Sequence, residues 1–286
     1  MRIPDRLLVA LEAAASVALD HPRGAAPHVI DALTRQPVAG RSPVVARFEE
    51  LAAAMAGNDD HDGTAAIVAL LPDARRHRSP TPLPPGPSSI LDAARQAATI
   101  SRSHTYGNDS DQVGRSLLAT WPARAGVLAH IPAPISRSLA DAGVRSPSGL
   151  AFDDHVSLLV AAVGDAADRT MRAEVELIRL HDRYIAQLEA QGEHRARSIV
   201  SLLISDPIVT VDAIVTGFDV SHVGARAGLD ELTAAGWLAR VDAQDHASPP
   251  EWLTIGVLDT LIAAFEEPGS PCTLRSPTPV PSAPLP

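Results

Sequence analysis

The residues best suited to chemistry are gathered in one polar segment, HTYGNDSDQVGR, which runs from His104 to Arg115. Asp109 and Asp111 lie two residues apart within it, a spacing compatible with a metal ion bound by a loop. The rest of the chain contains no nucleophile-elbow motif, no phosphate-binding GxxxxGK loop and no dinucleotide-binding glycine fingerprint. Any prediction of function therefore depends mainly on this segment.

Helical sequence flanks the polar segment on both sides. Ser88 and Ser89 are the two candidates for the N-cap of a helix that runs to about His104. A second helix is predicted over residues 113–128, bent or broken by its internal proline. We expect the two helices to place His104 and Arg115 at facing ends, around one shallow cleft.

The segment resembles the Fic motif, H-x-F-x-[DE]-G-N-G-R-x-x-R, which lies on a helix, a loop and a second helix. The resemblance implies that His104 is the base that deprotonates a target hydroxyl, with Tyr106 in the position of the Phe. Gly114 and Arg115 match the end of the motif, where arginine holds phosphate oxygens. Fic proteins usually transfer AMP from ATP to a hydroxyl side chain, with Mg²⁺ as the metal.

The centre of the motif departs from the family pattern. Asn108 replaces the acidic residue that holds Mg²⁺, and Gln112 replaces the first arginine. Asp-Ser-Asp, at residues 109–111, replaces the Gly-Asn-Gly run whose N–H groups cradle phosphates. The resemblance thus assigns the metal position to Asn108 and the cofactor-binding positions to Asn108, Ser110, Gln112, Gly114 and Arg115.

Each of these changes weakens the binding of a triphosphate. Asp109 and Asp111 restrict a backbone that glycines would leave free, and they add two negative charges. At an effective dielectric constant of about 20, one charge about 4 Å from a phosphate costs roughly 4 kcal/mol. We predict a pseudoenzyme with little or no adenylyltransferase activity and no bound cofactor. The alternative is a nucleotidyltransferase or phosphotransferase with altered metal ligation, which would use ATP and Mg²⁺.

The resemblance covers roughly residues 88 to 241. ILDAARQAATISRSH precedes the loop of the motif, and LLATWPARAGVL followed by IPAPIS comes after it, in the order found in Fic proteins. RSIVSLLISDPIVTVDAIVTGFDVSHVGARAGLDELTAAGWLARV then resembles the winged helix that ends many bacterial Fic proteins. The inhibitory [ST]-x-x-x-E-[GN] helix of many family members is not found, which agrees with a protein without activity.

The order of elements after residue 196 also predicts a winged helix-turn-helix. Thr210 and Ser221 are the expected N-caps of its second and third helices. The expected helices span residues 196–205, 211–218 and 222–235, and the expected strands span 237–241 and 251–253. Such a domain suggests DNA binding, for which the candidate contacts are Ser221, His222 and Arg226.

The charge of this C-terminal segment disfavours DNA. Residues 196–267 contain 3 arginines and 11 acidic side chains, a formal charge of −8, in a chain whose net charge is −10. Affinity for DNA depends largely on cations that meet phosphates. We therefore favour a protein partner or a homo-oligomer, and a winged-helix transcriptional regulator stays as the alternative.

The composition predicts a mainly α-helical protein, since hydrophobic residues make up 45% of the chain and aromatic residues only 3%. The single cysteine and the lack of a long apolar run predict a cytoplasmic protein without a membrane segment. The predicted units are an N-terminal helical region (1–78), a Fic-like helical core (88–192), a winged helix with a small β-hairpin (196–267) and a disordered proline-rich tail (268–286).

Three further helices are predicted from apolar residues at spacings of three and four, over 6–20, 43–56 and 153–191. The last of these has a broken apolar stripe, which either packs inside its own domain or pairs with another chain. Asp154 and His155 at its start are interpreted as part of a polar loop and helix cap, and a metal-ligand pair is the alternative.

Overall fold

The computed structural model describes residues 3, 5–20, 86–104, 106–144, 149–191, 196–241 and 250–265. This part of the chain is mainly helical, as predicted, with one small antiparallel sheet. The predicted helix over 43–56, most of the predicted N-terminal region and the proline-rich tail lie outside it. In chain order the elements are α1 (Asp5–Asp20), α6 (Ile90–Ser103), η1 (Gly107–Asp109), α7 (Ser110–Arg124), α8 (Ile135–Asp141), α9 (Phe152–Gln191), α10 (Ala196–Ser205), β1 (Ile208–Val209), α11 (Val211–Phe218), α12 (His222–Ala234), β2 (Leu238–Val241), β3 (Glu251–Thr254) and α13 (Ile255–Phe265).

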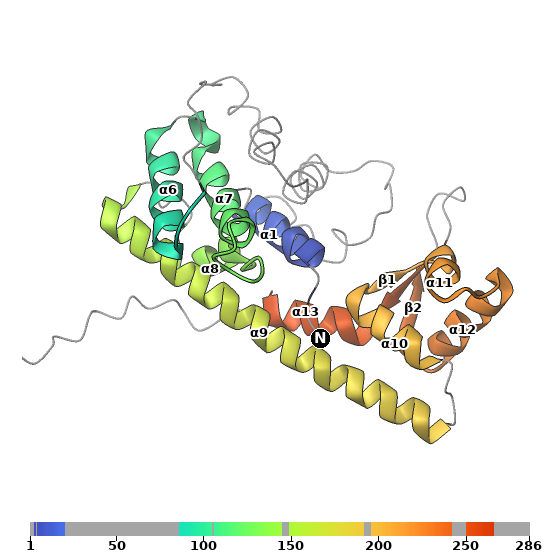
Figure 1. The fold of residues 1–286 in the computed structure, drawn as a ribbon. Coiled ribbons are helices and arrows are strands. Elements are labelled where there is room, and N and C mark those ends of the chain that lie inside the picture. Colours follow the sequence, from blue (N-terminus) through green and yellow to red (C-terminus); the bar gives the residue numbers. More distant parts are fainter. Residues whose placement is uncertain are drawn as a thin grey trace, which may run out of the picture.

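Helices α6 and α7 lie side by side and form one end of the molecule, together with α1 and α8 (Figure 1). The hydroxyl of Ser89 accepts a hydrogen bond from the Asp92 N–H at 3.1 Å, so the predicted N-cap of α6 is confirmed. α7 begins at Ser110, three residues before the predicted start, and contains Pro122 in its last turns. The core between these helices consists largely of small side chains, which lets their backbones come close together.

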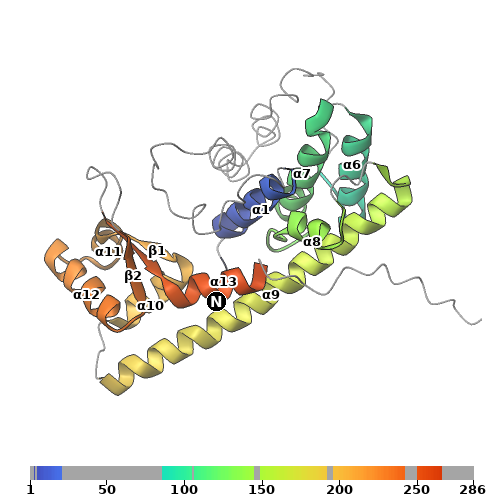
Figure 2. The ribbon, with the colours of Figure 1, turned by 180° about the vertical axis from the view of Figure 1, so that it is seen from behind.

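Helix α9 contains 40 residues and connects the two ends of the molecule (Figures 1 and 2). At a rise of 1.5 Å per residue, it is about 60 Å long. Its buried face contacts α6, α8, α10 and α13. The predicted helix over 153–191 is therefore confirmed, and it packs on several other elements of its own chain.

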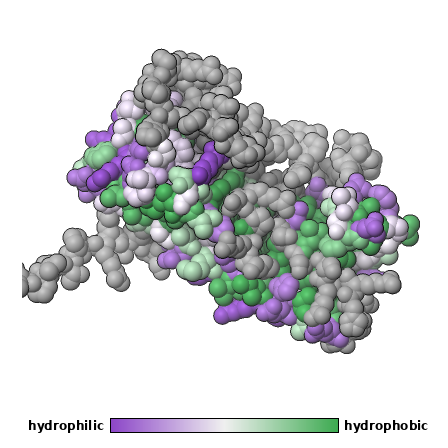
Figure 3. Space-filling model, viewed as in Figure 1, coloured by the Kyte–Doolittle hydropathy of each residue, from purple (hydrophilic) through white to green (hydrophobic). Residues whose placement is uncertain are grey.

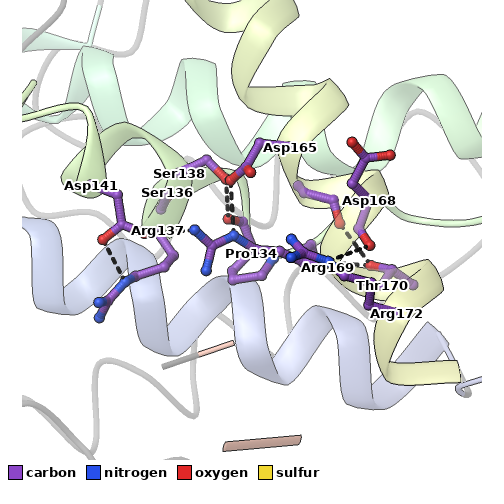
Figure 4. Close-up of polar contacts among 12 residues, drawn as sticks. Pro134, Ser136, Arg137, Ser138, Asp141, Asp165, Asp168, Arg169, Thr170 and Arg172 are labelled. Carbon is purple, nitrogen blue, oxygen red and sulfur yellow. Dashed lines mark hydrogen bonds and ion pairs between the residues drawn. The ribbon is translucent and has the colours of Figure 1, made fainter. Parts of the chain in front are cut away.

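A buried ionic network fixes α8 against α9 (Figure 4). The Arg169 side chain is 1% exposed, and its guanidinium donates to Asp165 at 2.8 Å and to Asp141 at 2.7 Å. Ser138 on α8 donates to the same Asp165 carboxylate at 2.6 Å. Thr170 adds a hydrogen bond to the carbonyl of Ala133 at 3.0 Å. A buried arginine needs such partners because an unpaired buried charge is costly.

The strands form a three-stranded antiparallel sheet in the order β1-β3-β2. Trp252 in the central strand is fully buried and lies opposite Val209 on one side and Arg240 on the other. Thr210 and Ser221 accept hydrogen bonds from backbone N–H groups three residues later, which confirms both predicted N-caps. The two predicted strands are also present, as β2 and β3.

Helix α13 is absent from the predicted elements. Its sequence, IGVLDTLIAAF, is almost continuously apolar, so it lacks the helical periodicity that marks an amphipathic helix. The helix packs against α9 and buries Val257, Leu261 and Phe265. None of the described helices is long and apolar enough to cross a membrane.

Candidate functional site

The predicted site segment forms a helix, a tight connection and a second helix. α6 ends at Ser103, and His104 follows as its C-cap in the left-handed conformation, with φ 48°. A short 3₁₀ turn, Gly107–Asp109, then leads into α7. His104 thus caps α6 and Arg115 lies within α7, so the predicted helix, connection and second helix are present. The prediction that the two residues face each other around a shallow cleft is wrong, because the Arg115 side chain is buried against α1. The side chains of His104 and Asn108 are exposed at this connection.

Ser110 closes the connection between the helices. Its hydroxyl donates to the carbonyl of Gly107 at 2.9 Å and accepts from the N–H of Tyr106 at 3.1 Å. The residue is 1% exposed, so its side chain is occupied by the backbone of the turn itself. Tyr106 is also buried, and burial raises the pKa of its phenol.

Gly114 lies where α6 and α7 come into closest contact. A Cβ at this position would be 2.7 Å from the hydroxyl of Ser101 and 2.8 Å from the carbonyl oxygen of Ala97. Real Cβ atoms do not come so close to other heavy atoms. The glycine is therefore explained by the packing of the two helices, without any phosphate.

Gln112 and Arg115 both face the protein interior, with exposed fractions of 3% and 1%. The guanidinium of Arg115 lies 3.5 Å from the hydroxyl of Ser16 on α1. The cation is also close enough to Glu12 on α1 to favour the ionised form of that carboxyl. With Ser110 and Gly114, four of the five predicted cofactor positions are thus buried, and Asn108 alone among them is exposed.

Glu12 is fully buried at the N-terminus of α8. Its carboxylate accepts hydrogen bonds from the Ser136 hydroxyl at 2.6 Å and from the Ser136 N–H at 3.2 Å. Burial raises the pKa of Glu12 from 4.5 to about 7, although Ser136 and the charge of Arg115 act in the opposite direction. Glu12 therefore caps α8 from another helix.

His155 lies at the start of a helix, as predicted, but its side chain is buried, whereas a polar loop or helix cap would leave it exposed. It lies in the first turn of α9 and is fully buried, and neither ring nitrogen has a hydrogen-bond partner among the residues that the structure describes. Burial lowers the pKa of its imidazole, the Asp111 carboxylate opposes this shift, and Arg102 adds to it. The histidine thus lies close to Asp111 of the candidate segment and to Arg102 on α6.

The predicted nucleic-acid contacts are brought together at the first turns of α12. The hydroxyl of Ser221 accepts from the Gly224 N–H at 3.1 Å and caps the helix. His222 is 69% exposed, with its Nδ1 atom 3.6 Å from an oxygen of Asp212. Arg226 is exposed one turn further along. Val223, which is 80% exposed, projects from the same turn.

Sequence patterns did not identify Glu12, Ser136 or Arg169 as parts of buried polar clusters. The available signal was weak: Glu12 is the one carboxylate in the otherwise apolar run 7–18, and its partner Ser136 is 124 residues away. Within the described residues, no group of three or more His, Cys, Asp and Glu side chains could hold a metal ion.

Comparison with known proteins adds no assignment. No protein-family model matches this chain, and no curated protein matches its sequence.

Proposed function

We propose that this protein is a Fic-like pseudoenzyme, which has lost most or all AMP transfer and acts through contacts with other proteins. The observation that carries the proposal is the burial of Arg115, the residue that the motif assigns to phosphate. Its side chain is 1% exposed and contacts Ser16 on α1. A phosphate would have to displace α1 from this position.

The remaining positions of the motif support the same proposal. Gln112 is buried and uncharged, so it supplies no cation to a phosphate. Ser110 uses its hydroxyl to close the turn, and Gly114 is required by the contact between α6 and α7. Asp109 and Asp111 repel an anion. Among the residues of the motif that the structure describes, His104 and Asn108 are the exposed ones, and neither provides the charge that a triphosphate needs.

Contacts with protein are favoured by the C-terminal surface. The segment 196–267 has a formal charge of −8, which repels a nucleic-acid backbone. The first turn of α12 exposes Val223 where a DNA-binding helix would present polar or cationic side chains. An exposed apolar residue within an acidic surface is better matched to a partner protein.

Calorimetric titration of the full chain with ATP, with and without Mg²⁺, tests the loss of nucleotide binding. We expect no dissociation constant tighter than about 100 μM, which corresponds to roughly −5.5 kcal/mol. We also expect Arg115→Ala to lower the melting temperature and the matched change His104→Ala, at an exposed position, to leave it unchanged. Tight binding of Mg²⁺-ATP that Arg115→Ala removes would contradict the proposal and favour the transferase with altered metal ligation.

A winged-helix transcriptional regulator is the second candidate. It is favoured by the three-stranded sheet and by the exposure of His222 and Arg226 at the start of α12. A mobility-shift experiment with genomic fragments distinguishes the two. We expect no specific shift. A shift that salt weakens and that Arg226→Ala removes would establish DNA binding in place of protein contacts.

A further inference from the structure

Helix α9 exposes an apolar stripe, part of which borders the groove that α9 forms with α13. Met171, Val175 and Ile178 are 59%, 42% and 39% exposed. Their spacings of four and three residues place them on one face of the helix. Hydrophobic surface is also visible along the edge of the molecule where α9 runs (Figure 3). A contiguous group of exposed apolar side chains indicates a contact surface, whereas scattered ones do not.

A row of charged residues runs along one side of this stripe. Asp168, Arg172, Glu176 and Arg179 are all exposed, and their charges alternate in sign along the helix. Glu176 and Arg179 form an ion pair within the chain. The order is negative, positive, negative, positive, and its midpoint lies near residue 174. When the row is read from its C-terminal end, the order becomes positive, negative, positive, negative, so each position carries the opposite charge.

A second helix with this same row, running in the opposite direction, would place an opposite charge against every charge of the first. A parallel copy would place like charges together, which is unfavourable. The apolar stripe has nearly the same midpoint as the charged row, so both features select the same alignment. A two-fold axis with self-complementary surfaces is the usual arrangement of homodimers.

We propose that the protein forms a two-fold symmetric dimer through antiparallel pairing of α9, with the axis near residue 174. Met171 of each copy packs against Val175 and Ile178 of the other copy. Asp168 lies opposite Arg179 of the second copy, and Arg172 lies opposite its Glu176. The proposal of this dimer is based on the surface of α9 and does not depend on the proposed function.

The surroundings of the stripe leave room for a second helix. A groove of about 740 Å³ lies between α9 and α13, and Met171 and Val175 form part of its lining. Ala263 and Ala264 form part of the opposite wall, where short side chains allow a close approach. Arg172, Glu176 and Arg179 of the charged row line the same groove, so side chains of the second copy that enter it meet both the stripe and the row.

Analytical ultracentrifugation of the full chain over a range of micromolar concentrations tests the dimer. We expect the wild-type protein to be a dimer and Met171→Asp to be monomeric. Asp168→Arg places two arginines opposite each other, and two-fold symmetry makes this repulsion occur twice. We therefore expect the dimer to weaken about tenfold or more. The double variant with Asp168→Arg and Arg179→Asp should regain most of the lost affinity. Asp230→Arg on α12 is the matched control and should leave the dimer unchanged.

Circular dichroism of each variant shows whether the fold is retained, because all the substituted side chains are exposed. A wild-type protein that stays monomeric would overturn the proposal. So would a dimer that persists in Met171→Asp, since it must then use another face. Failure of the double charge exchange to restore the affinity of a folded protein would overturn the antiparallel alignment.

Discussion

At the scale of single residues, Glu12 has the most unusual environment in the described part of the N-terminal region. Its carboxyl has no exposure to water and faces the N-terminus of α8 and the cation of Arg115. Those partners favour the charged form, but desolvation is the larger effect. The carboxyl is therefore near its titration midpoint in a neutral solution, and the stability of the protein depends on its state.

We predict that Glu12 makes stability fall as the pH rises. The pKa of this carboxyl is 4.5 in the unfolded chain and about 7 in the fold, so folding takes up a proton between these values. Stability is then greatest below pH 4.5, as far as this group is concerned, and decreases up to pH 7 by about 3 kcal/mol at most. Denaturant unfolding of the wild type and Glu12→Gln at pH 5 and pH 8 measures the effect.

Glu12→Gln keeps an acceptor for Ser136 but carries no charge, so it should remove most of this pH dependence. Glu231→Gln, at an exposed position on α12, is the control and should follow the wild type. Equal pH dependence in the wild type and Glu12→Gln would show that the carboxyl does not titrate in this range.

Gly114 supports a second prediction at this scale. Gly114→Ala places a methyl group within 2.8 Å of two atoms of α6, one of them a backbone oxygen, so the helices must separate. We expect a loss of about 1–3 kcal/mol in unfolding free energy. The matched change Gly228→Ala on α12 meets no atom within 4 Å and should stabilise the protein by about 1 kcal/mol. Thermal melting of both variants checks the opposite signs.

At the scale of elements, the ends of α6 and α11 share one feature. Each helix ends in a non-glycine residue with a left-handed backbone, His104 with φ 48° and Asp219 with φ 52°. Such a conformation favours glycine, because a Cβ approaches the neighbouring carbonyl. At Asp219 the N–H still bonds to the carbonyl of Val215 at 3.1 Å. The backbone hydrogen bond at this helix end is therefore kept, and the energetic cost of the left-handed conformation comes from the Cβ atom.

We predict that His104→Gly and Asp219→Gly each stabilise the protein by about 0.5–1 kcal/mol, since glycine adopts this backbone without strain. The gain is limited by the larger freedom of glycine in the unfolded chain. Chemical denaturation measures both variants. Destabilisation by His104→Gly alone would show that its imidazole makes a contact that matters for the fold.

The elements that sequence patterns predicted well are those with local signals. Ser89, Thr210 and Ser221 each cap a helix at the predicted position, because a cap depends only on the next three residues. α13 has no such signal and was missed. The burial of the Arg115 side chain could not be predicted either. It depends on contact with α1, which lies about a hundred residues earlier in the chain.

At the scale of the whole molecule, Tyr184 is one of the α9 side chains that attach the C-terminal elements. Its ring stacks on Trp237 with a centroid distance of 4.1 Å and an interplanar angle of 14°. The hydroxyl of Tyr184 lies against Gly256 at the start of α13, where a Cβ would approach it to 2.7 Å. One side chain of α9 thus contacts both the start of β2 and α13.

We predict that Gly256→Ala destabilises the protein and that Tyr184→Phe partly compensates for it. The alanine methyl group clashes with the hydroxyl, and the phenylalanine removes that oxygen while it keeps the stack on Trp237. In a double-mutant cycle measured by denaturant unfolding, we expect a favourable coupling of about 1 kcal/mol. The coupling is partial because Leu180 also lies 3.2 Å from the added Cβ. Strict additivity would mean that the chain moves away from the clash in another way.

Because α9 is one continuous helix, the number of residues between its two attachment points sets how the two ends of the molecule are rotated relative to each other. Each residue of an α-helix turns the chain by about 100° and advances it by 1.5 Å. One residue inserted between Thr170, which bonds to Ala133, and Tyr184, which stacks on Trp237, would therefore rotate one attachment point by more than a quarter of a turn relative to the other. A deletion or insertion in this segment would be tolerated best when it changes the helix by whole turns, each about 5.4 Å long. The length of α9 therefore determines the angle between the helical end and the sheet-bearing end.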